Sequence, residues 1–224
     1  MVLDRMVRIS DSTVRRLSGY LRALDELDPE GEAIVSSQAL AERTGVTSAQ
    51  VRKDLSHFGS FGRRGFGYEV AGLRREIRGI LGLSRRWNVA LVGAGNLGSA
   101  LFAYKEFRER GFDVVAVFDN SPDRIGHRIG DLVIEPMSRF RELCEERHID
   151  IGVVATPARA AQEVAELLVE AGVRAVLNFA PRKLLVPRHV TLRDVNMEVE
   201  LESLAFALRS SETRAGGRRR VEEW

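Results

Sequence analysis

The apolar residues near the start of the chain recur at helical spacing. The segment SDSTVRRLSGYLRALDEL opens on serine and aspartate residues that can cap a helix, and four apolar residues then fall on one side of it: Val14, Leu17, Leu21 and Leu24. After a turn at Pro29 and Gly31, the short run AIVSS is expected to be extended. We therefore predict a helix from Ser10, followed by a short strand.

Two shorter helices joined by RTGVT are expected next. The first, SQALAERTG, turns Leu40 and Ala41 inward and ends at Gly45. The second, TSAQVRKDLSHFG, begins at Thr47 with Gln50 three residues later, which is the spacing of a capping box. Its buried stripe consists of Val51, Leu55 and Phe58. The glycine-rich SFGRRGFGYEV then predicts a small hairpin, and AGLRREIRGILGL predicts another helix.

The pattern changes after the short basic stretch SRRW at residues 84–87. Four apolar, β-branched runs alternate with helical segments: NVALVG, FDVVAVFD, IDIGVVAT and VRAVLNFA. Near-continuous apolar strands separated by helices indicate a parallel sheet covered on both faces, as in a doubly wound α/β Rossmann fold. One more run, HVTLRDV, and one helix follow before the tail SSETRAGGRRRVEEW, which we expect to be loose.

The composition is that of an ordinary soluble globular protein, with 44% apolar and 29% charged residues in a chain of 224. No apolar run approaches the roughly 20 residues that span a bilayer. The first residues, MVLDRMVRISDS, lack the apolar core of a signal peptide. The single cysteine, Cys144, excludes an intrachain disulfide and fits a reducing cytoplasm. We expect Cys144 to be a small core residue and not a nucleophile.

Charge is unevenly distributed, although the net charge is only +2. Residues 1–87 carry 15 lysine and arginine residues against 11 acidic ones, whereas residues 88–208 carry 14 against 18. A basic front half joined to an acidic middle predicts a polyanionic partner for the front half alone. Chance scatter of surface charge is the alternative, and this split by itself does not exclude it.

Gly93, Gly95 and Gly98 in NVALVGAGNLGSALF match G-x-G-x-x-G between an expected strand and an expected helix. In such a turn the first glycine permits the tight bend, and the second lets the backbone approach phosphates. The third lets the helix pack close to the strand. The N-terminus of the helix then offers free N–H groups to a pyrophosphate. The pattern therefore predicts a dinucleotide-binding turn.

An acidic residue stands where such a site needs one. Asp119 ends the second apolar run, 21 residues after Gly98. A carboxylate there hydrogen-bonds the adenosine ribose and repels a 2′-phosphate, which favours NAD over NADP. Arg124, a few residues on, keeps NADP open. A Rossmann-like domain that has lost its ligand is the other alternative.

The two short helices have the spacing of a helix-turn-helix, although an ordinary helical hairpin has the same spacing. Polar residues lie on the first turns of the second helix, off its apolar stripe, where side chains reach bases or phosphates in a major groove. Two arginines in FGRRGFG stand at a hairpin tip, like the wing of a winged helix. We expect Gln50 and Arg52 to read bases, and the full set of DNA-binding residues is Ser48, Gln50, Arg52, Lys53, Arg63 and Arg64.

No catalytic constellation accompanies the dinucleotide turn. A dehydrogenase needs a further domain that orients its substrate and supplies an acid or base, but little chain follows NFAP at 178–181. The four histidines stand in separate segments, and no Ser/His/Asp set, metal-ligand cluster or P-loop is visible. We expect a protein that is not an enzyme and binds no metal. The alternative is an NAD-dependent oxidoreductase with an N-terminal helical extension.

The sequence resembles the Rex family of bacterial redox-sensing transcriptional repressors. The resemblance is carried by QVRKDLSHFGSFGRRGFGY, LVGAGNLGSAL, the tyrosine at 104 and LNFAP, and it extends from about residue 10 to about residue 210. It implies a homodimer that binds a palindromic operator when NADH is low and leaves the DNA when NADH is high. Together with the patterns above, it gives a winged helix-turn-helix at 1–84, a Rossmann NAD(H)-binding domain at 85–195, a dimerisation helix at 196–210 and a flexible tail at 211–224.

The resemblance also implies that the last helix crosses to the partner subunit, beside the nicotinamide site. In VNMEVELESLAFALRS the apolar residues are spread over more than one helical face, which suits burial in a partner: Val199, Leu201, Leu204, Phe206 and Leu208. By resemblance, Arg22 pairs with an acidic residue near this helix. The matching position here is Asn196, with Asp194 two residues earlier, so either residue could make the contact.

NADH and NAD+ differ only in the nicotinamide ring, which is neutral in the first and cationic in the second. A dry pocket made by Tyr104 and the partner's last helix would favour the neutral form, because burying an unpaired charge is costly. A Rossmann-type interaction protein that uses DNA as a scaffold, without regulated release, is a further alternative. The cofactor-binding residues that we expect are Gly93, Ala94, Gly95, Asn96, Leu97, Gly98, Tyr104, Asp119, Thr156, Pro157, Asn178 and Phe206.

Overall fold

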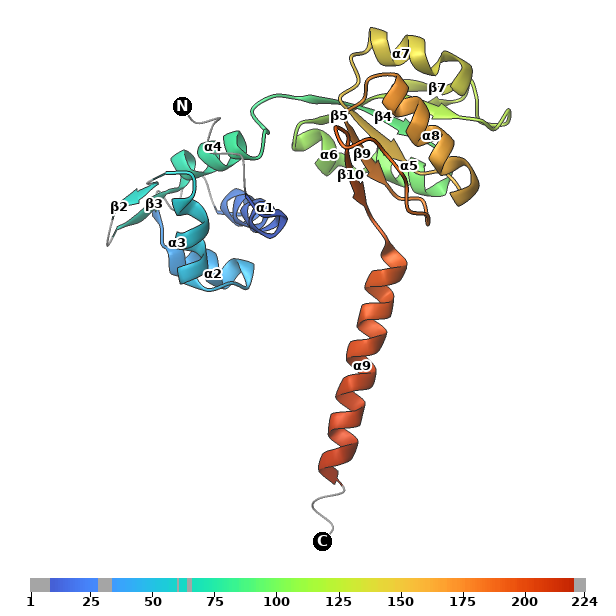
Figure 1. The fold of residues 1–224 in the computed structure, drawn as a ribbon. Helices are drawn as coiled ribbons and strands as arrows, with labels where there is room; N and C mark the ends of the chain where they lie inside the picture. The colour runs from blue at the N-terminus through green and yellow to red at the C-terminus, as the bar shows by residue number, and fades with distance from the viewer. Residues whose placement is uncertain (1–8, 28–33, 60, 64–65, 220–224) are drawn as a thin grey trace. The chain divides into compact units, whose positions relative to one another are not determined.

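The computed structural model describes residues 9–27, 34–59, 61–63 and 66–219, except for the side chains of Arg63 and of residues 212–219. The chain divides into two units, Met1–Arg85 and Arg86–Trp224 (Figure 1). One cluster of buried apolar residues forms the core of the first unit, and two clusters lie in the second. None of the described helices is long and apolar enough to cross a membrane.

The first unit has the elements of a winged helix-turn-helix, as the sequence predicts. Its helices are α1 (Asp11–Asp25), α2 (Ser37–Thr44), α3 (Ser48–Ser56) and α4 (Val70–Ile80), and its strands are β1 (Ile34–Val35), β2 (Gly62–Arg63) and β3 (Gly67–Glu69). The strands form an antiparallel sheet in the order β1-β3-β2, so β2 and β3 make the expected hairpin. Its tip, at residues 64–65, lies outside the described residues.

Side-chain caps determine where these helices begin. Ser10 and Thr47 each accept a hydrogen bond from the backbone N–H three residues later. Gly45 ends α2 with a φ of 68°, a left-handed conformation that glycine adopts without strain. The capping box expected at α3 is only half formed, because the Gln50 side chain donates to Asp54 and does not return to the backbone of Thr47.

The predicted stripe of α1 is wrong at one position. Val14 is 42% exposed, whereas Thr13 beside it is buried and continues the row that runs through Leu17 and Leu21. Thr13 can take a buried place because its hydroxyl is within hydrogen-bond distance of Ser10 and accepts from Arg16.

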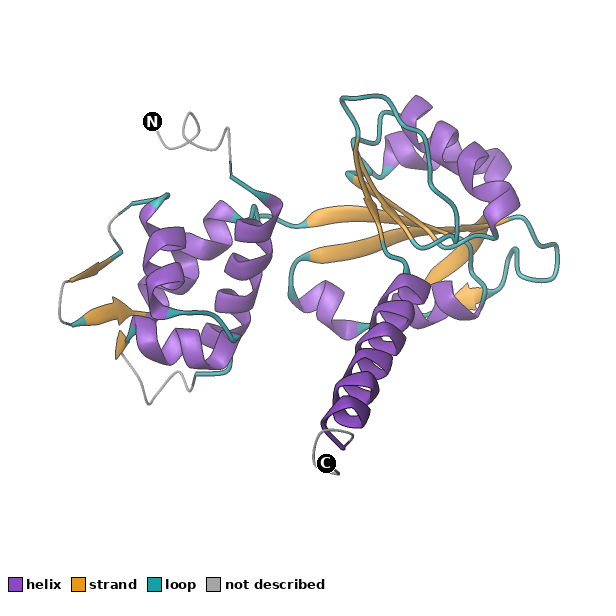
Figure 2. Ribbon diagram, turned by 60° about the horizontal axis from the view of Figure 1, so that its bottom comes forward, coloured by secondary structure: helices purple, strands orange, loops and turns teal. Residues whose placement is uncertain are grey.

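The second unit is a seven-stranded sheet with helices on both faces (Figure 2). Its strands are β4 (Trp87–Val92), β5 (Phe112–Asp119), β6 (Arg128–Ile129), β7 (Leu132–Pro136), β8 (Ile151–Val154), β9 (Ala175–Asn178) and β10 (Thr191–Asp194). Its helices are α5 (Asn96–Ala103), α6 (Lys105–Glu109), α7 (Phe140–Glu146), α8 (Ala158–Glu170) and α9 (Met197–Arg219), with a 3-10 turn at Met137–Arg139.

The strand order is β10-β9-β8-β4-β5-β7-β6, and all neighbours pair in parallel except β6 with β7. The chain moves outward in one direction from β4 through β5 and β7, then returns to β8 on the other side of β4. This is the Rossmann order, in which ligands bind outside the carboxyl ends of the strands where the direction reverses. The predicted doubly wound α/β sheet is confirmed.

Side chains of the central strands alternate between two cores. Ala90 and Val92 belong to the cluster that includes Leu168 of α8, and Val89 and Leu91 belong to the cluster on the other face. Cys144 of α7 is buried in the first of these clusters, where burial raises the pKa of its thiol to about 11. The thiol is therefore protonated near neutral pH, as expected of a core residue.

Two features differ from the expectation. The sequence pattern does not single out β6 and β7, because β7 is interrupted by Glu135 and buries only Ile134. The last helix, expected to end at residue 210, continues to Arg219, which corrects that boundary. Extending a helix that already exists adds one hydrogen bond for each residue fixed, so a polar segment can continue it despite two glycines.

Candidate functional site

The glycine turn joins β4 to α5 at the carboxyl end of the parallel sheet. Gly93 has a φ of 102°, and a Cβ on it would lie 2.5 Å from the carbonyl oxygen of Ala155. A Cβ on Gly98 would lie 1.8 Å from the carbonyl oxygen of Gly93. Both distances are far below the roughly 3.5 Å of favourable contact, so the turn keeps its shape only with glycine at these two positions.

Gly95 is glycine for a different reason. A Cβ on it would meet no protein atom nearer than the Arg124 guanidinium, 4.0 Å away, so the protein itself leaves room for a side chain there. Gly95 is also the N-cap of α5, and no side chain caps this helix. The first N–H groups of α5 are therefore available to an anion at a point where the helix dipole favours negative charge.

Asp119 ends β5 beside this turn and is held by the backbone. Its Oδ2 accepts from the N–H of Ala94 at 2.7 Å, and its Oδ1 accepts from the N–H of Ser121 at 2.8 Å. Burial by itself would raise the pKa of Asp119, but these donors and the nearby charge of Arg124 hold the pKa below its usual value. The carboxylate is ionised near neutral pH and keeps lone pairs for hydroxyl donors.

A cavity of about 630 Å³ opens between the turn and the ends of β5 and β8. This volume is typical of small-molecule sites. The cavity brings together seven of the predicted cofactor-binding residues: Gly93, Gly95, Asn96, Leu97, Asp119, Thr156 and Pro157. Ala94 and Gly98 lie behind this wall, where they hold Asp119 and α5 in place.

Thr156 and two arginines complete the cavity. The hydroxyl oxygen of Thr156 is buried without a hydrogen-bond partner in the described part of the chain, which is uncommon for a buried polar atom. Arg124 and Arg159 also line the cavity. A glycine turn with free N–H groups, an ionised carboxylate at one end, two cations and a hydroxyl that needs a partner fit a dinucleotide.

Sequence reasoning missed part of the wall. Arg159 and Met137 line the cavity but belong to no motif, and Phe179 lies in LNFAP but is not among the predicted binding residues. Each follows a parallel strand at its carboxyl end, which is the signal that could have identified them.

Besides Ala94 and Gly98, three more predicted residues do not line this cavity. Asn178 is buried and donates to the carbonyl oxygen of Arg182 and to Asp194, each at 2.8 Å, so it shapes the loop after β9. Phe206 lies on α9 and is 74% exposed. Tyr104 is 50% exposed and packs edge-on against Phe107, with ring centroids 5.1 Å apart.

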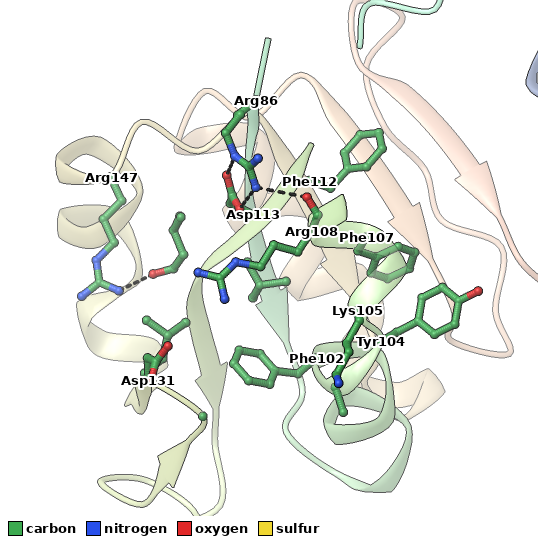
Figure 3. A pocket seen from close by; sticks show the side chains of 15 residues that line it. Arg86, Phe102, Tyr104, Lys105, Phe107, Arg108, Phe112, Asp113, Asp131 and Arg147 are labelled. Atoms are coloured by element: carbon green, nitrogen blue, oxygen red, sulfur yellow. Dashed lines mark hydrogen bonds and ion pairs between the residues drawn. The ribbon is translucent and has the colours of Figure 1, made fainter. Parts of the chain in front are cut away.

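Tyr104 lines a second cavity, of about 910 Å³, at the opposite end of β5 (Figure 3). Arg86 pairs there with Asp113 and also donates to the carbonyl oxygen of Arg108, while Arg147 donates to a carbonyl oxygen of β5. Arg86 and Arg147 are thus already bonded to groups of the protein. The second cavity contains neither the glycine turn nor the unpartnered hydroxyl of Thr156.

The expected DNA-binding residues of the first unit lie on two elements. Arg52 and Lys53 of α3 are exposed, and Ser48 and Gln50 are half-buried. Arg52 donates to the hydroxyl of Ser37 at 2.9 Å, across to the start of α2. Two of the expected DNA-binding residues cannot be placed on the surface: Arg63 belongs to β2 but its side chain is not described, and Arg64 lies outside the described residues.

A buried carboxylate joins α3 to α1. Asp54 is 1% exposed and accepts two hydrogen bonds from Arg16, at 2.6 Å and 2.8 Å, one from Tyr20 at 2.9 Å and one from Gln50 at 2.7 Å. Burial would raise the pKa of Asp54, but these donors hold the pKa below its usual value. The sequence pattern does not single out this cluster, although Asp54 falls within the buried stripe of α3.

The last helix has little apolar cover from the described part of its own chain. Its apolar side chains are between 48% and 74% exposed: Val199, Leu201, Leu204, Phe206 and Leu208. A small apolar groove, with a volume of about 150 Å³, lies on one face of the sheet. The groove is lined by Val89, Leu91, Leu101, Phe107, Phe112, Val114, Ile151, Val153 and Leu177.

Both residues that could contact Arg22 have local partners. The side-chain oxygen of Asn196 accepts from the N–H groups of Glu198 and Val199, so Asn196 caps α9. Asp194 accepts from Asn178. The contact with Arg22 stays a prediction.

Comparison with known proteins agrees with both units. The family described as "Putative DNA-binding protein N-terminus" matches residues 8–56, and the family described as "CoA binding domain" matches residues 84–182. The redox-sensing transcriptional repressor Rex of Pelotomaculum thermopropionicum is 49% identical over 212 residues, which cover 95% of this chain and 100% of the relative.

Two solved structures are similar over nearly the whole chain. The structure of RSP in complex with β-NAD+ and operator DNA has a TM-score of 0.88 at 36% identity, and the match covers 95% of this chain and 98% of that one. The structure of RSP in complex with β-NADH has a TM-score of 0.83 at 35% identity, covering 93% and 98%.

Proposed function

The chain belongs to the Rex family of redox-sensing transcriptional repressors, and we infer from this that it binds operator DNA when NADH is low and is released when NADH binds. It is a repressor and not an enzyme, so the oxidoreductase alternative is set aside. One observation supports the regulatory role: the same chain contains a winged helix and a dinucleotide cavity built around the glycine turn.

We propose that the cavity at the glycine turn holds the dinucleotide. The free N–H groups of α5 would bind the pyrophosphate, with Gly95 allowing its close approach. Asp119 would accept from the adenosine ribose, and Thr156 would find a partner on the ligand. NAD(H) is a regulatory ligand here, so these residues bind and orient it and carry out no chemistry on it.

Discrimination between the two redox forms requires contacts at the nicotinamide. A ligand shifts an equilibrium only by the difference in its affinity for the two states. NAD+ carries a positive charge on this ring and NADH does not, so a dry, apolar pocket favours NADH. We propose that the partner's Phe206, an exposed aromatic side chain in the single chain, supplies an apolar wall of this pocket; Tyr104, which lines the cavity at the opposite end of β5, is not placed at this site by the single chain.

We propose a homodimer in which each α9 packs on the second copy. The exposed apolar side chains of α9 need cover, and the apolar groove on the sheet offers a surface of matching chemistry. A twofold dimer presents two copies of α3, which suits a palindromic operator. A repressor that acts on DNA and has a single buried thiol is expected in the cytoplasm.

Replacing Asp119 by asparagine should weaken NADH binding by roughly tenfold or more, since a hydrogen bond to a charged group contributes about 1.5–3 kcal/mol. The asparagine also points an NH2 group at one of the two backbone donors that now bind the carboxylate. NADPH should be weakened less than NADH, because the charge that repels its 2′-phosphate is lost.

The measurement is the NADH concentration that releases half of the protein from labelled operator DNA. Asp123→Asn is the matched control, because Asp123 is an exposed carboxylate four residues later that does not line the dinucleotide cavity. An unchanged release curve for Asp119→Asn would show that the cofactor binds elsewhere.

A further inference from the structure

We propose that Gln50 is an adenine-reading residue whose side-chain amide is fixed in one orientation by Asp54. The inference rests on operator binding as the function, and it adds which base is read and why. The evidence lies in the first unit, where Gln50 is the third residue of α3 and the N-terminal residues of a recognition helix contact base edges.

The orientation of the amide follows from the charge of its partner. An ionised carboxylate only accepts hydrogen bonds, so the group that faces Asp54 at 2.7 Å must be the NH2 of Gln50. The Gln50 oxygen is then turned away. It has no hydrogen-bond partner in the described part of the chain and is not buried, so it is open to solvent.

The Asp54 carboxylate, which clamps the Gln50 amide in one orientation, is itself held in place. Arg16 holds both oxygens of Asp54, and Tyr20 holds Oδ2, so the carboxylate cannot rotate to accommodate a flipped amide. A flip would place the Gln50 oxygen against a carboxylate oxygen, an arrangement with no proton between the two atoms. Gln38 of α2 is a useful contrast, because its NH2 also donates to an acidic residue one turn later, Glu42, but the pair is exposed.

A fixed amide discriminates among the four bases. Gln50 presents an acceptor oxygen and one remaining N–H donor side by side. Adenine offers the complementary pair in the major groove, a donor at N6 and an acceptor at N7. Cytosine offers only the donor at N4. Guanine O6 and thymine O4 are acceptors, and they would face the Gln50 oxygen without a proton between them.

The test selects binding sites for the full-length protein from a randomised double-stranded DNA library, without NADH, and compares base frequencies between variants. The wild type should enrich a palindrome with one adenine position in each half-site that depends on Gln50. In Gln50→Ala that position should lose its preference, a change of roughly five- to a hundredfold in relative affinity for adenine, while the other positions keep theirs. Gln38→Ala is the matched control and should leave the profile unchanged.

Two further variants test the clamp. In Asp54→Asn the new side-chain amide can donate as well as accept, which frees the Gln50 amide to turn. The selectivity for adenine over the other bases should therefore decrease, and guanine or thymine should be tolerated. Tyr20→Phe removes one hydrogen bond from Asp54 but leaves its bond to Gln50, so the profile should stay that of the wild type. Thermal unfolding of each variant identifies any that fail to fold. If Asp54→Asn fails to fold, the result for Gln50→Ala alone decides whether the proposal stands.

The proposal is overturned if the Gln50→Ala profile equals that of the wild type, or if the position that depends on Gln50 selects a G·C pair instead of an A·T pair. A wild-type protein that enriches no sequence would overturn the proposed function and this inference together. A wild-type palindrome without a Gln50-dependent position overturns the inference alone.

Discussion

Replacing Gly98 by alanine is expected to abolish regulation by NADH while leaving operator binding intact. The new Cβ would lie 1.8 Å from the carbonyl oxygen of Gly93. The Cβ is bonded directly to the helix backbone and the oxygen belongs to the backbone of the turn, so neither can move aside without opening the turn. Either α5 shifts away from β4 or the turn unfolds, and each removes the N–H groups that would bind the pyrophosphate. NADH affinity should fall at least about a hundredfold, which corresponds to roughly 2.7 kcal/mol.

Fluorescence titration with NADH measures the affinity, and a gel shift with operator DNA measures repression. Gly95→Ala separates a folding defect from a blocked site. A Cβ at this position meets no protein atom nearer than 4.0 Å, but it would occupy the space that the pyrophosphate needs. It should bind NADH poorly with an unchanged melting temperature. Gly79→Ala, in the first unit, meets only ordinary contacts and should behave as the wild type. A Gly98→Ala protein that is still released by NADH would contradict the account of the turn.

Replacing Leu201 and Leu204 together by glutamate should dissociate the dimer. Both side chains are more than 60% exposed in the single chain, so the change should not affect folding of the subunit. In a dimer that buries α9, each leucine contributes about 1.5–3 kcal/mol, and a buried glutamate adds a further penalty. Loss of the paired half-site contacts should reduce operator affinity by roughly a hundredfold or more.

Molar mass in solution, measured by light scattering, reports the oligomeric state directly. Ser203→Glu is the control, since it adds a negative charge to α9 at a polar position. We expect a dimer for the control and a monomer for the double variant. If the double variant stays a dimer with wild-type operator affinity, α9 is not the dimerisation element.

The parts of the site that the sequence predicts are those set by local backbone chemistry. The glycine turn is such a part, because only glycine fits at Gly93 and Gly98 and the spacing follows from the strand-turn-helix geometry. Asp119 is another, since it ends a strand of the parallel sheet next to β4. The winged helix was predictable in the same way, from its caps and from the glycine-rich hairpin.

The remaining parts depend on contacts between distant segments. Nothing in the local pattern joins Arg16 to Asp54, 38 residues apart, so the fixed orientation of the Gln50 amide emerges only in the fold. Tyr104 illustrates the converse case. It follows the glycine turn closely in sequence, yet α5 ends at Ala103 and the Tyr104 side chain lines a different cavity.

The central claim is that the affinity of this chain for operator DNA depends on the NADH/NAD+ ratio. One titration tests this claim most directly. Full-length protein bound to labelled operator DNA is titrated with NADH and, in parallel, with NAD+ at the same concentrations. The account predicts release by NADH and little or no release by NAD+, with the difference lost in Gly98→Ala. Equal release by both ligands, or release by neither, would contradict it.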